Sequence, residues 1–173
     1  MNEPFNPKTM LRSPREKLGW YIILPRLIDK VRLHQRGLLP ADYVPNLLKM
    51  PNLETGSFPF DGRFLFFTGL DPEALRTAIL STPDDQTVLQ WVNQNAKVHT
   101  DLEKEQWSDS TVKEFSTPNP ERIALRTHFY PKVAELVGSE ILGSLNPFDM
   151  VDFDENRISL EDLLARNQDG RDR

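Results

Sequence analysis

The sequence contains no cysteine among its 173 residues. Disulfides, thiolate catalysis and zinc sites with sulfur ligands are therefore excluded. The absence fits a reducing compartment. The first residues show neither the basic stretch nor the apolar stretch of a secretion signal. Both observations predict a cytoplasmic location.

Long apolar runs are also missing. The longest near the front of the chain, Trp20–Leu24, stops at Pro25. A helix needs about 20 apolar residues to cross a bilayer. We therefore expect no membrane contact.

The sequence carries none of the familiar catalytic motifs. With only eight glycines it has no glycine-rich phosphate loop and no G-x-G-x-x-G. It also lacks the G-x-S-x-G turn of serine hydrolases and the H-E-x-x-H helix of zinc proteases. No cofactor is predicted from motifs.

Charge is unevenly distributed along the chain. Residues 1–37 carry eight Lys/Arg and three Asp/Glu, a balance of +5, and the remainder carries 13 and 23, a balance of −10. The basic front could bind an anion or pair with the acidic remainder. A pI near 5.3 argues against nucleic acid as a partner, since nucleic-acid-binding domains usually have a pI above about 9.

Proline is frequent, with 14 residues, and several prolines stand where helices begin. Cap signals followed by apolar residues at helical spacing start near Ser13, Pro25, Asp61, Asp71, Thr82, Thr100 and Asn119. No segment shows the alternation of several strands. The sequence predicts a mainly α, irregular multi-helix single domain with long proline-rich loops and little or no β structure.

The domain organisation follows from these signals. We expect an extended arm over residues 1–12, one α-helical domain over 13–166 and a frayed tail over 167–173. Pro131 should kink or split the helix that begins at Asn119. Residues 37–59 hold four prolines and predict a long irregular loop, a feature that is often functional.

Several ordered motifs resemble one known family. They are LRSPREKLG at residues 11–19, ILPRLIDKVR at 23–32, DGRF at 61–64 and FTGLDPEAL at 67–75. Together they resemble the bacterial family catalogued as domain of unknown function 5069, over residues 11 to about 92. The aspartate-rich FDMVDFDENRI at 148–158 extends the resemblance. The chain departs from the family at Gly19-Trp20, where members tend to have a glycine pair, and residues 97–145 match only loosely. The resemblance implies a bacterial cytoplasmic protein without an assigned activity.

Charged residues beside the apolar stripe of the helix near Pro25 form a candidate anion site. Arg26 and Arg32 stand three residues either side of Asp29, and Lys30 follows it. Two guanidiniums could grip a carboxylate or phosphate, and Asp61 and Arg63 could complete the site. Alternatively, these residues form a partly buried ion ladder that holds the helix against acidic neighbours. The candidate set is Arg26, Asp29, Lys30, Arg32, Asp61 and Arg63.

Five phenylalanines cluster within ten positions. Phe60, Phe64 and Phe67 share one helix face and predict core. Phe58 and Phe66 fall off that face. They could line a pocket or a partner surface beside the proline-rich loop.

Two patterns hint at metals but lack required positions. His34, His99 and His128 lie on three segments, whereas helical metal sites pair two ligands one turn apart. The segment from Asp152 begins like a calcium loop, but Arg157 and Leu163 replace the glycine and glutamate that such a loop needs. We expect no metal at either.

Three functional hypotheses follow. The first is a non-catalytic binding or interaction protein that uses the 37–59 loop and nearby aromatic and basic residues. The second is a small enzyme acting on an anionic metabolite. The third is a metal-binding helical bundle. An enzyme requires converging titratable groups in a cleft, and an interaction protein requires an exposed apolar surface. The partner is thus a small anion or another protein.

Overall fold

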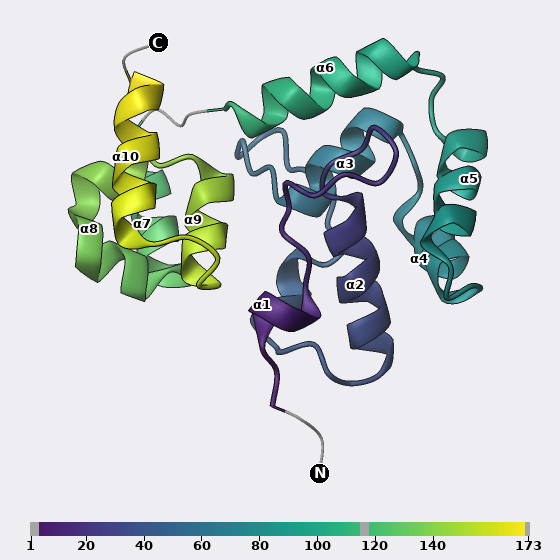
Figure 1. Ribbon diagram of the computed structural model, residues 1–173, viewed down its shortest axis with the longest axis horizontal. Helices are drawn as coiled ribbons and strands as arrows, with labels where there is room; N and C mark the ends of the chain where they lie inside the picture. The colour runs from purple at the N-terminus through teal and green to yellow at the C-terminus, as the bar shows by residue number, and fades with distance from the viewer. Residues whose placement is uncertain (1–3, 115–117, 172–173) are drawn as a thin grey trace. The chain divides into compact units, whose positions relative to one another are not determined.

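A computed structural model describes residues 4–114 and 118–171. Within these residues the chain forms ten α-helices and one short 3₁₀ helix, and the only β structure is two isolated bridges (Figure 1). The prediction of a mainly α, multi-helix fold is confirmed. The chain divides into two compact units, residues 1–108 and 109–173. The single domain over 13–166 stays a prediction.

The first unit is built around α2 (Leu24–Gln35), which packs against α3 (Phe60–Thr68) and α4 (Pro72–Leu80). The α2 stripe of Leu24, Leu27, Ile28 and Val31 is completely buried, as its i, i+3, i+4, i+7 spacing predicts. The α5 helix (Asp85–Asn95) packs in turn on α4.

Local capping explains where these helices begin and end. Gly69 closes α3 in a left-handed conformation (φ 67°), and the Asp71 side chain caps α4 by accepting from the Ala74 amide at 2.8 Å. Thr100 and Glu103 form the predicted capping box of α6 (Asp101–Val112). The expected cap at Thr82 is wrong, because Asp84 caps α5 by accepting from two amides.

The segment before α2 differs from expectation. Ser13 starts a hydrogen-bonded turn rather than a helix, because Arg15 donates its amide to the Ser13 hydroxyl and the chain then bends back. Within the expected extended arm, residues 7–10 form the short helix α1 (Pro7–Met10), capped by Asn6. The reason is a side-chain cap followed by proline, the same signal that starts the longer helices.

The 37–59 loop is mostly irregular, as predicted, with one 3₁₀ turn (η1, Val44–Asn46) and one β-bridge between Asn52 and Ser57. It packs on α3: Leu48 is buried, and the Phe64 side chain of α3 is fully buried. Of the three phenylalanines predicted to lie in the core, only Phe64 is fully buried, and Phe60 and Phe67 are half-buried.

The second unit contains α7 (Pro120–Phe129), α8 (Pro131–Ser144), α9 (Pro147–Asp154) and α10 (Leu160–Arg171). Pro131 splits α7 from α8, as expected, and Gly138 (φ 76°) kinks α8. The core of this unit gathers Val133, Leu142, Leu145, Met150 and Leu163.

The segment from Asp152, which begins like a calcium loop, belongs partly to α9, a helix that Asn146 caps by accepting from two amides. One expectation for the C-terminal part is wrong. The tail does not fray at 167, because α10 continues to residue 171 and Asn167 is buried. Residues 172 and 173 of the predicted tail, like residues 1–3 of the predicted arm, lie outside the described part of the chain.

Candidate functional site

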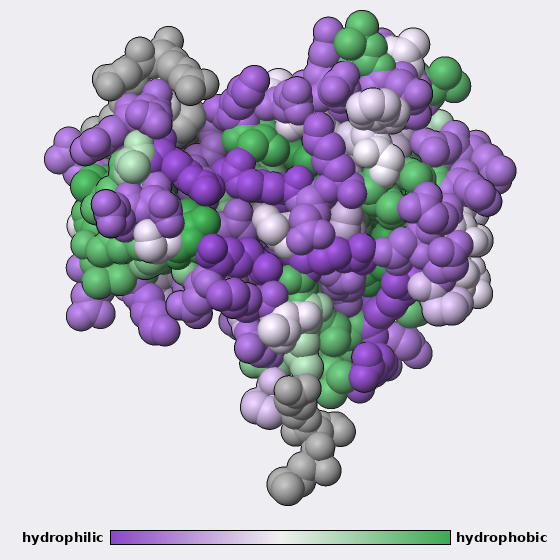
Figure 2. Space-filling model, in the orientation of Figure 1, coloured by the Kyte–Doolittle hydropathy of each residue, from purple (hydrophilic) through white to green (hydrophobic). Residues whose placement is uncertain are grey.

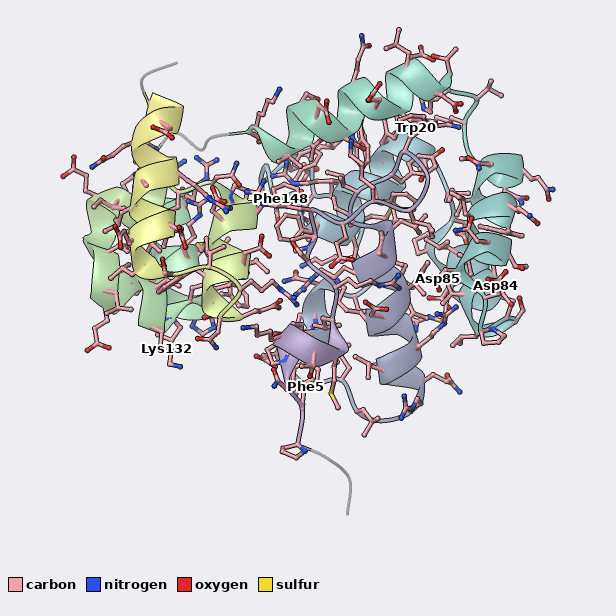
Figure 3. The ribbon with its side chains drawn as sticks, viewed as in Figure 1. Phe5, Trp20, Asp84, Asp85, Lys132 and Phe148 are labelled. Carbon is pink, nitrogen blue, oxygen red and sulfur yellow. The ribbon has the colours of Figure 1, made fainter. Side chains whose placement is uncertain are left out.

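A ladder of four charged side chains joins α2 to the start of α5. Arg12 forks onto Asp29, with Nε and Nη2 each donating to one carboxylate oxygen at 2.9 and 2.6 Å. The Nη1 of Arg12 donates to Asp85 at 2.6 Å, and Arg32 donates to the other Asp85 oxygen at 2.7 Å. Figure 3 shows Asp85 beside Asp84 at the start of α5. Positively and negatively charged side chains alternate along the ladder, so both carboxylates accept hydrogen bonds from a guanidinium.

Electrostatics within the ladder favour the charged forms. The hydrogen bonds that Arg12 donates to Asp29 and Asp85 raise the pKa of Arg12 above its ordinary value, although burial opposes this. Burial alone would raise the pKa of Asp85, but the hydrogen bonds from Arg12 and Arg32 outweigh it and lower that pKa below 3.8. At neutral pH Arg12 and Asp85 are therefore charged.

Arg26 contacts both the N-terminal segment and the 37–59 loop. It is buried, its Nη1 donates to the carbonyl oxygen of Arg12 at 3.1 Å, and its guanidinium carbon lies 6.0 Å from the centre of the Tyr43 ring. Tyr43 in turn meets Phe5 edge to face. Arg26 thus ties the 37–59 loop and the N-terminal segment to α2.

Lys30 and Asp61 form a buried ion pair between α2 and α3. The Lys30 Nζ donates to Asp61 Oδ1 at 2.5 Å, and both side chains are buried. The second oxygen, Oδ2, accepts from the Leu48 amide at 2.8 Å. Asp61 therefore links α2, α3 and the 37–59 loop through one carboxylate.

Arg63, the last of the six predicted site residues, contacts the backbone of the 37–59 loop. Its Nε donates to the carbonyl oxygen of Phe58 at 3.2 Å.

The structure brings Asp29 and Arg32 together through Arg12 and Asp85, and separately pairs Lys30 with Asp61. Sequence analysis missed Arg12 and Asp85 as partners. The available signal was their charge, Arg12 in the basic front and Asp85 in the acidic first turn of a helix.

Four large apolar side chains on the 37–59 loop and α3 are solvent-exposed, and we call them the loop patch. Their exposed fractions are 45% for Met50, 67% for Leu53, 36% for Phe58 and 51% for Phe66. The Phe58 and Phe66 rings meet edge to face with centroids 6.0 Å apart. The two phenylalanines predicted as a contact surface are thus exposed neighbours.

The part of the loop that carries Leu53 is a tight hairpin. Asn52 and Ser57 exchange both backbone hydrogen bonds, at 2.9 and 3.1 Å. The Asn52 side chain accepts from the amides of Glu54 and Thr55. Gly56 closes the turn with φ 67°. Leu53 is therefore exposed from an ordered turn rather than from an extended chain.

Each histidine has its own surroundings. The His99 ring stacks on the Phe67 ring with centroids 4.2 Å apart. The Phe67 ring also stacks on Trp107, with centroids 4.4 Å apart. The His128 ring meets Phe129 edge to face, and His34 is an exposed residue of α2. In residues 4–114 and 118–171, no three His, Asp or Glu side chains are grouped closely enough to hold a metal ion.

The acidic motif of α9 is paired with arginines of its own unit. Arg166 donates to Asp149 at 3.0 Å. Arg157 donates to Glu155 at 3.1 Å and lies 3.7 Å from Asp152. These three carboxylates are buried. Their pairing indicates a structural role for the motif.

A shallow hollow lies between α4 and α5, with a volume of about 520 Å³. Trp91 forms one wall, and small residues of α4 form the floor. Glu73 is the one ionisable residue that lines it. The hollow brings no titratable groups together.

A comparison with family models identifies the class of protein. The model described as a domain of unknown function, DUF5069, matches residues 8–157. The chain belongs to this family. The match also spans residues 97–145, where the motifs resemble the family only loosely, and it includes both the ladder and the loop patch.

Two further findings accompany this assignment. A comparison with curated proteins finds no match. No helix in the described part of the chain is long and apolar enough to cross a membrane.

Proposed function

We propose that this chain is a non-catalytic interaction protein that binds another protein through the loop patch. One observation carries the proposal. Met50, Leu53, Phe58 and Phe66 are exposed on an ordered loop and the adjoining helix face. The rings of Phe58 and Phe66 are in contact, and adjoining exposed apolar groups of this kind mark interaction sites.

Order in the loop strengthens the proposal. A partner that binds a preformed loop does not have to supply the free energy for ordering it. The hairpin hydrogen bonds of Asn52 and the contact between Phe58 and Phe66 fix the loop before any partner arrives. Aromatic side chains are also the residues that most often dominate binding energy at protein interfaces.

The charged residues support a structural role more than an anion site. Asp29 and Asp85 already accept from Arg12, and Arg32 donates to Asp85. An incoming phosphate or carboxylate would have to displace one of these carboxylates. The face presented in Figure 2 is mostly hydrophilic, with hydrophobic groups between the hydrophilic ones.

The alternative is an enzyme acting on an anionic metabolite. Its candidate residues are Arg26 and Lys30, which stand one turn apart on α2 and are both buried. Because Lys30 is already paired with Asp61, a bound anion would have to compete with that carboxylate. A metal-binding bundle is the third possibility, and no observation favours it. For the interaction protein we propose a bacterial, cytoplasmic setting and no resident cofactor.

Site-specific photo-crosslinking in cells tests the proposal. A benzophenone amino acid replaces Leu53 or Phe66, with Leu102 and Phe129 as matched controls of similar exposure (61% and 44%). We expect one polypeptide to crosslink from positions 53 and 66 and not from 102 or 129.

Binding of that polypeptide, once purified, is then measured by calorimetry. Phe66→Ser and Leu53→Ser should weaken it at least tenfold, whereas Phe129→Ser should leave it unchanged. Equal affinity for all variants would overturn the proposal. A small anion retained in native mass spectrometry, and released by Arg26→Met, would favour the enzyme instead.

A further inference from the structure

We propose that Asp61 is a positioning residue that sets the 37–59 loop in the conformation that displays the loop patch. The inference rests on the proposed function, because it assigns a role in presenting that surface. Asp61 is nearly completely buried in the first turn of α3 and does not itself belong to the patch. It acts through the loop backbone.

The two carboxylate oxygens of Asp61 accept hydrogen bonds from different donors. Oδ1 accepts from Lys30 Nζ at 2.5 Å, and Oδ2 accepts from the Leu48 amide at 2.8 Å. A carboxylate suits this position because both of its oxygens accept. An amide would turn an NH₂ group toward one of the two donors. The site therefore requires an acid.

Leu48 shows why the loop needs such a contact. Its φ of 53° lies in the left-handed region, which is costly for a residue with a branched, bulky side chain. Strained conformations persist only where the surroundings hold them. The Asp61 carboxylate holds the amide of this residue, and the Leu48 side chain is buried.

The residue after Asp61 brings the loop backbone still closer to α3. A Cβ atom on Gly62 would lie 2.7 Å from the Lys49 carbonyl oxygen and 3.0 Å from the Pro51 nitrogen. Only glycine permits this approach without moving the loop. Asp61 and Gly62 thus fix residues 48–51, directly before the hairpin that carries Leu53.

The returning arm of the hairpin is fixed to the same helix. Arg63 donates to the Phe58 carbonyl oxygen at 3.2 Å, and the Phe58 ring meets Phe66. Three consecutive residues of α3, Asp61 to Arg63, therefore contact the chain on both sides of the hairpin. The conformation of the loop patch depends on this short stretch of helix.

Hydrogen exchange measured by NMR tests the inference. The variant combines Lys30→Met with Asp61→Leu, so that no buried charge is left without a partner. Amides of residues 47–58 should exchange at least tenfold faster than in the native chain, with amides of α2 and α4 unchanged. Asp29→Asn is the matched control, because it removes a neighbouring carboxylate that does not touch the loop. It should leave exchange in 47–58 unchanged.

A second variant keeps the test decisive if the first does not fold. Gly62→Ala should also accelerate exchange over residues 47–58, because its methyl group displaces the loop backbone. In the native chain the Leu48 amide should be the slowest-exchanging amide of the loop. Fast exchange of the Leu48 amide, or unchanged exchange over 47–58 in both variants, would overturn the role of Asp61.

Failure of this inference and of the proposed function can be told apart. Exchange rates report on the loop without any partner. If the variants open the loop and the crosslinked partner still binds with native affinity, the loop patch is not the binding surface although Asp61 positions the loop. If the loop stays closed and Phe66→Ser abolishes binding, the loop patch stands and the role of Asp61 falls.

Discussion

Arg12 and Asp29 form a forked ion pair in which two guanidinium nitrogens and the Arg12 backbone amide all donate to one carboxylate. The residues are 17 positions apart in sequence. The contact fastens the N-terminal segment along α2. Arg12 also reaches Asp85, so one side chain joins three parts of the first unit.

Replacing Arg12 with methionine should lower the free energy of unfolding by about 2 kcal/mol, because two partly buried carboxylates lose charged hydrogen bonds. Urea denaturation followed by circular dichroism measures the change. Arg36→Met is the control, since Arg36 is exposed at the end of α2, and it should shift stability by less than about 0.5 kcal/mol. Equal effects of the two substitutions would show that the ladder contributes nothing.

The lowered pKa of Asp85 predicts a loss of stability in acid. Its folded pKa lies below the ordinary 3.8, so the ion pairs stabilise the protein fully above about pH 4. The stabilisation is lost as pH falls further, through the folded pKa. Asp85→Asn should therefore be less stable than the native chain at pH 7, and the difference should shrink toward pH 2. A difference that is constant over this range would contradict the assignment.

Replacing Arg126 should lower the stability of the second unit strongly. Arg126 is buried, and its Nη1 lies 2.7 to 3.2 Å from the carbonyl oxygens of Leu142, Gly143 and Leu145 at the end of α8. A cation at a helix C-terminus is favourable. Arg126→Met should destabilise this unit by about 3 kcal/mol, measured by calorimetry. Exposed Lys132→Met should have almost no effect, and similar values for both would refute a capping role.

Asn167 offers a stabilising substitution. Its Oδ1 is buried and has no hydrogen-bond partner among the residues that the structure describes. Leu163, one turn earlier on α10, lies in the apolar core. Asn167→Leu should raise the free energy of unfolding by about 1 kcal/mol, because an unsatisfied polar group is removed. Exposed Gln168→Leu serves as the control, and destabilisation by Asn167→Leu would show that Oδ1 is satisfied.

Most helices of the first unit could be located from sequence because their signals are local. The stripe from Leu24 to Val31 and the caps at Asp71 and Thr100 depend only on neighbouring residues. The helices α9 and α10 were missed. Their sequences are rich in acidic residues, and only the folded chain shows that Arg166 pairs with Asp149 and Arg157 with Glu155.

The candidate site shows the same division. Sequence placed Phe58 and Phe66 off the core face of α3, and both are exposed. It also placed Asp29 and Arg32 on one helix beside a basic segment. It could not assign Arg12 to Asp29 or Asp85 to both arginines, because sequence gives the charge of a group and not its distance from others.

The sequence by itself determined the mainly helical class, the family and the position of the irregular 37–59 loop, since composition, caps and ordered motifs are all local information. Only the tertiary structure decided which charges pair and which apolar side chains stay exposed. Asp61 holds the Leu48 amide across 13 residues of chain, and Arg12 reaches Asp85 across 73. Contacts of this range depend on how helices pack, because packing alone brings distant groups within hydrogen-bond distance.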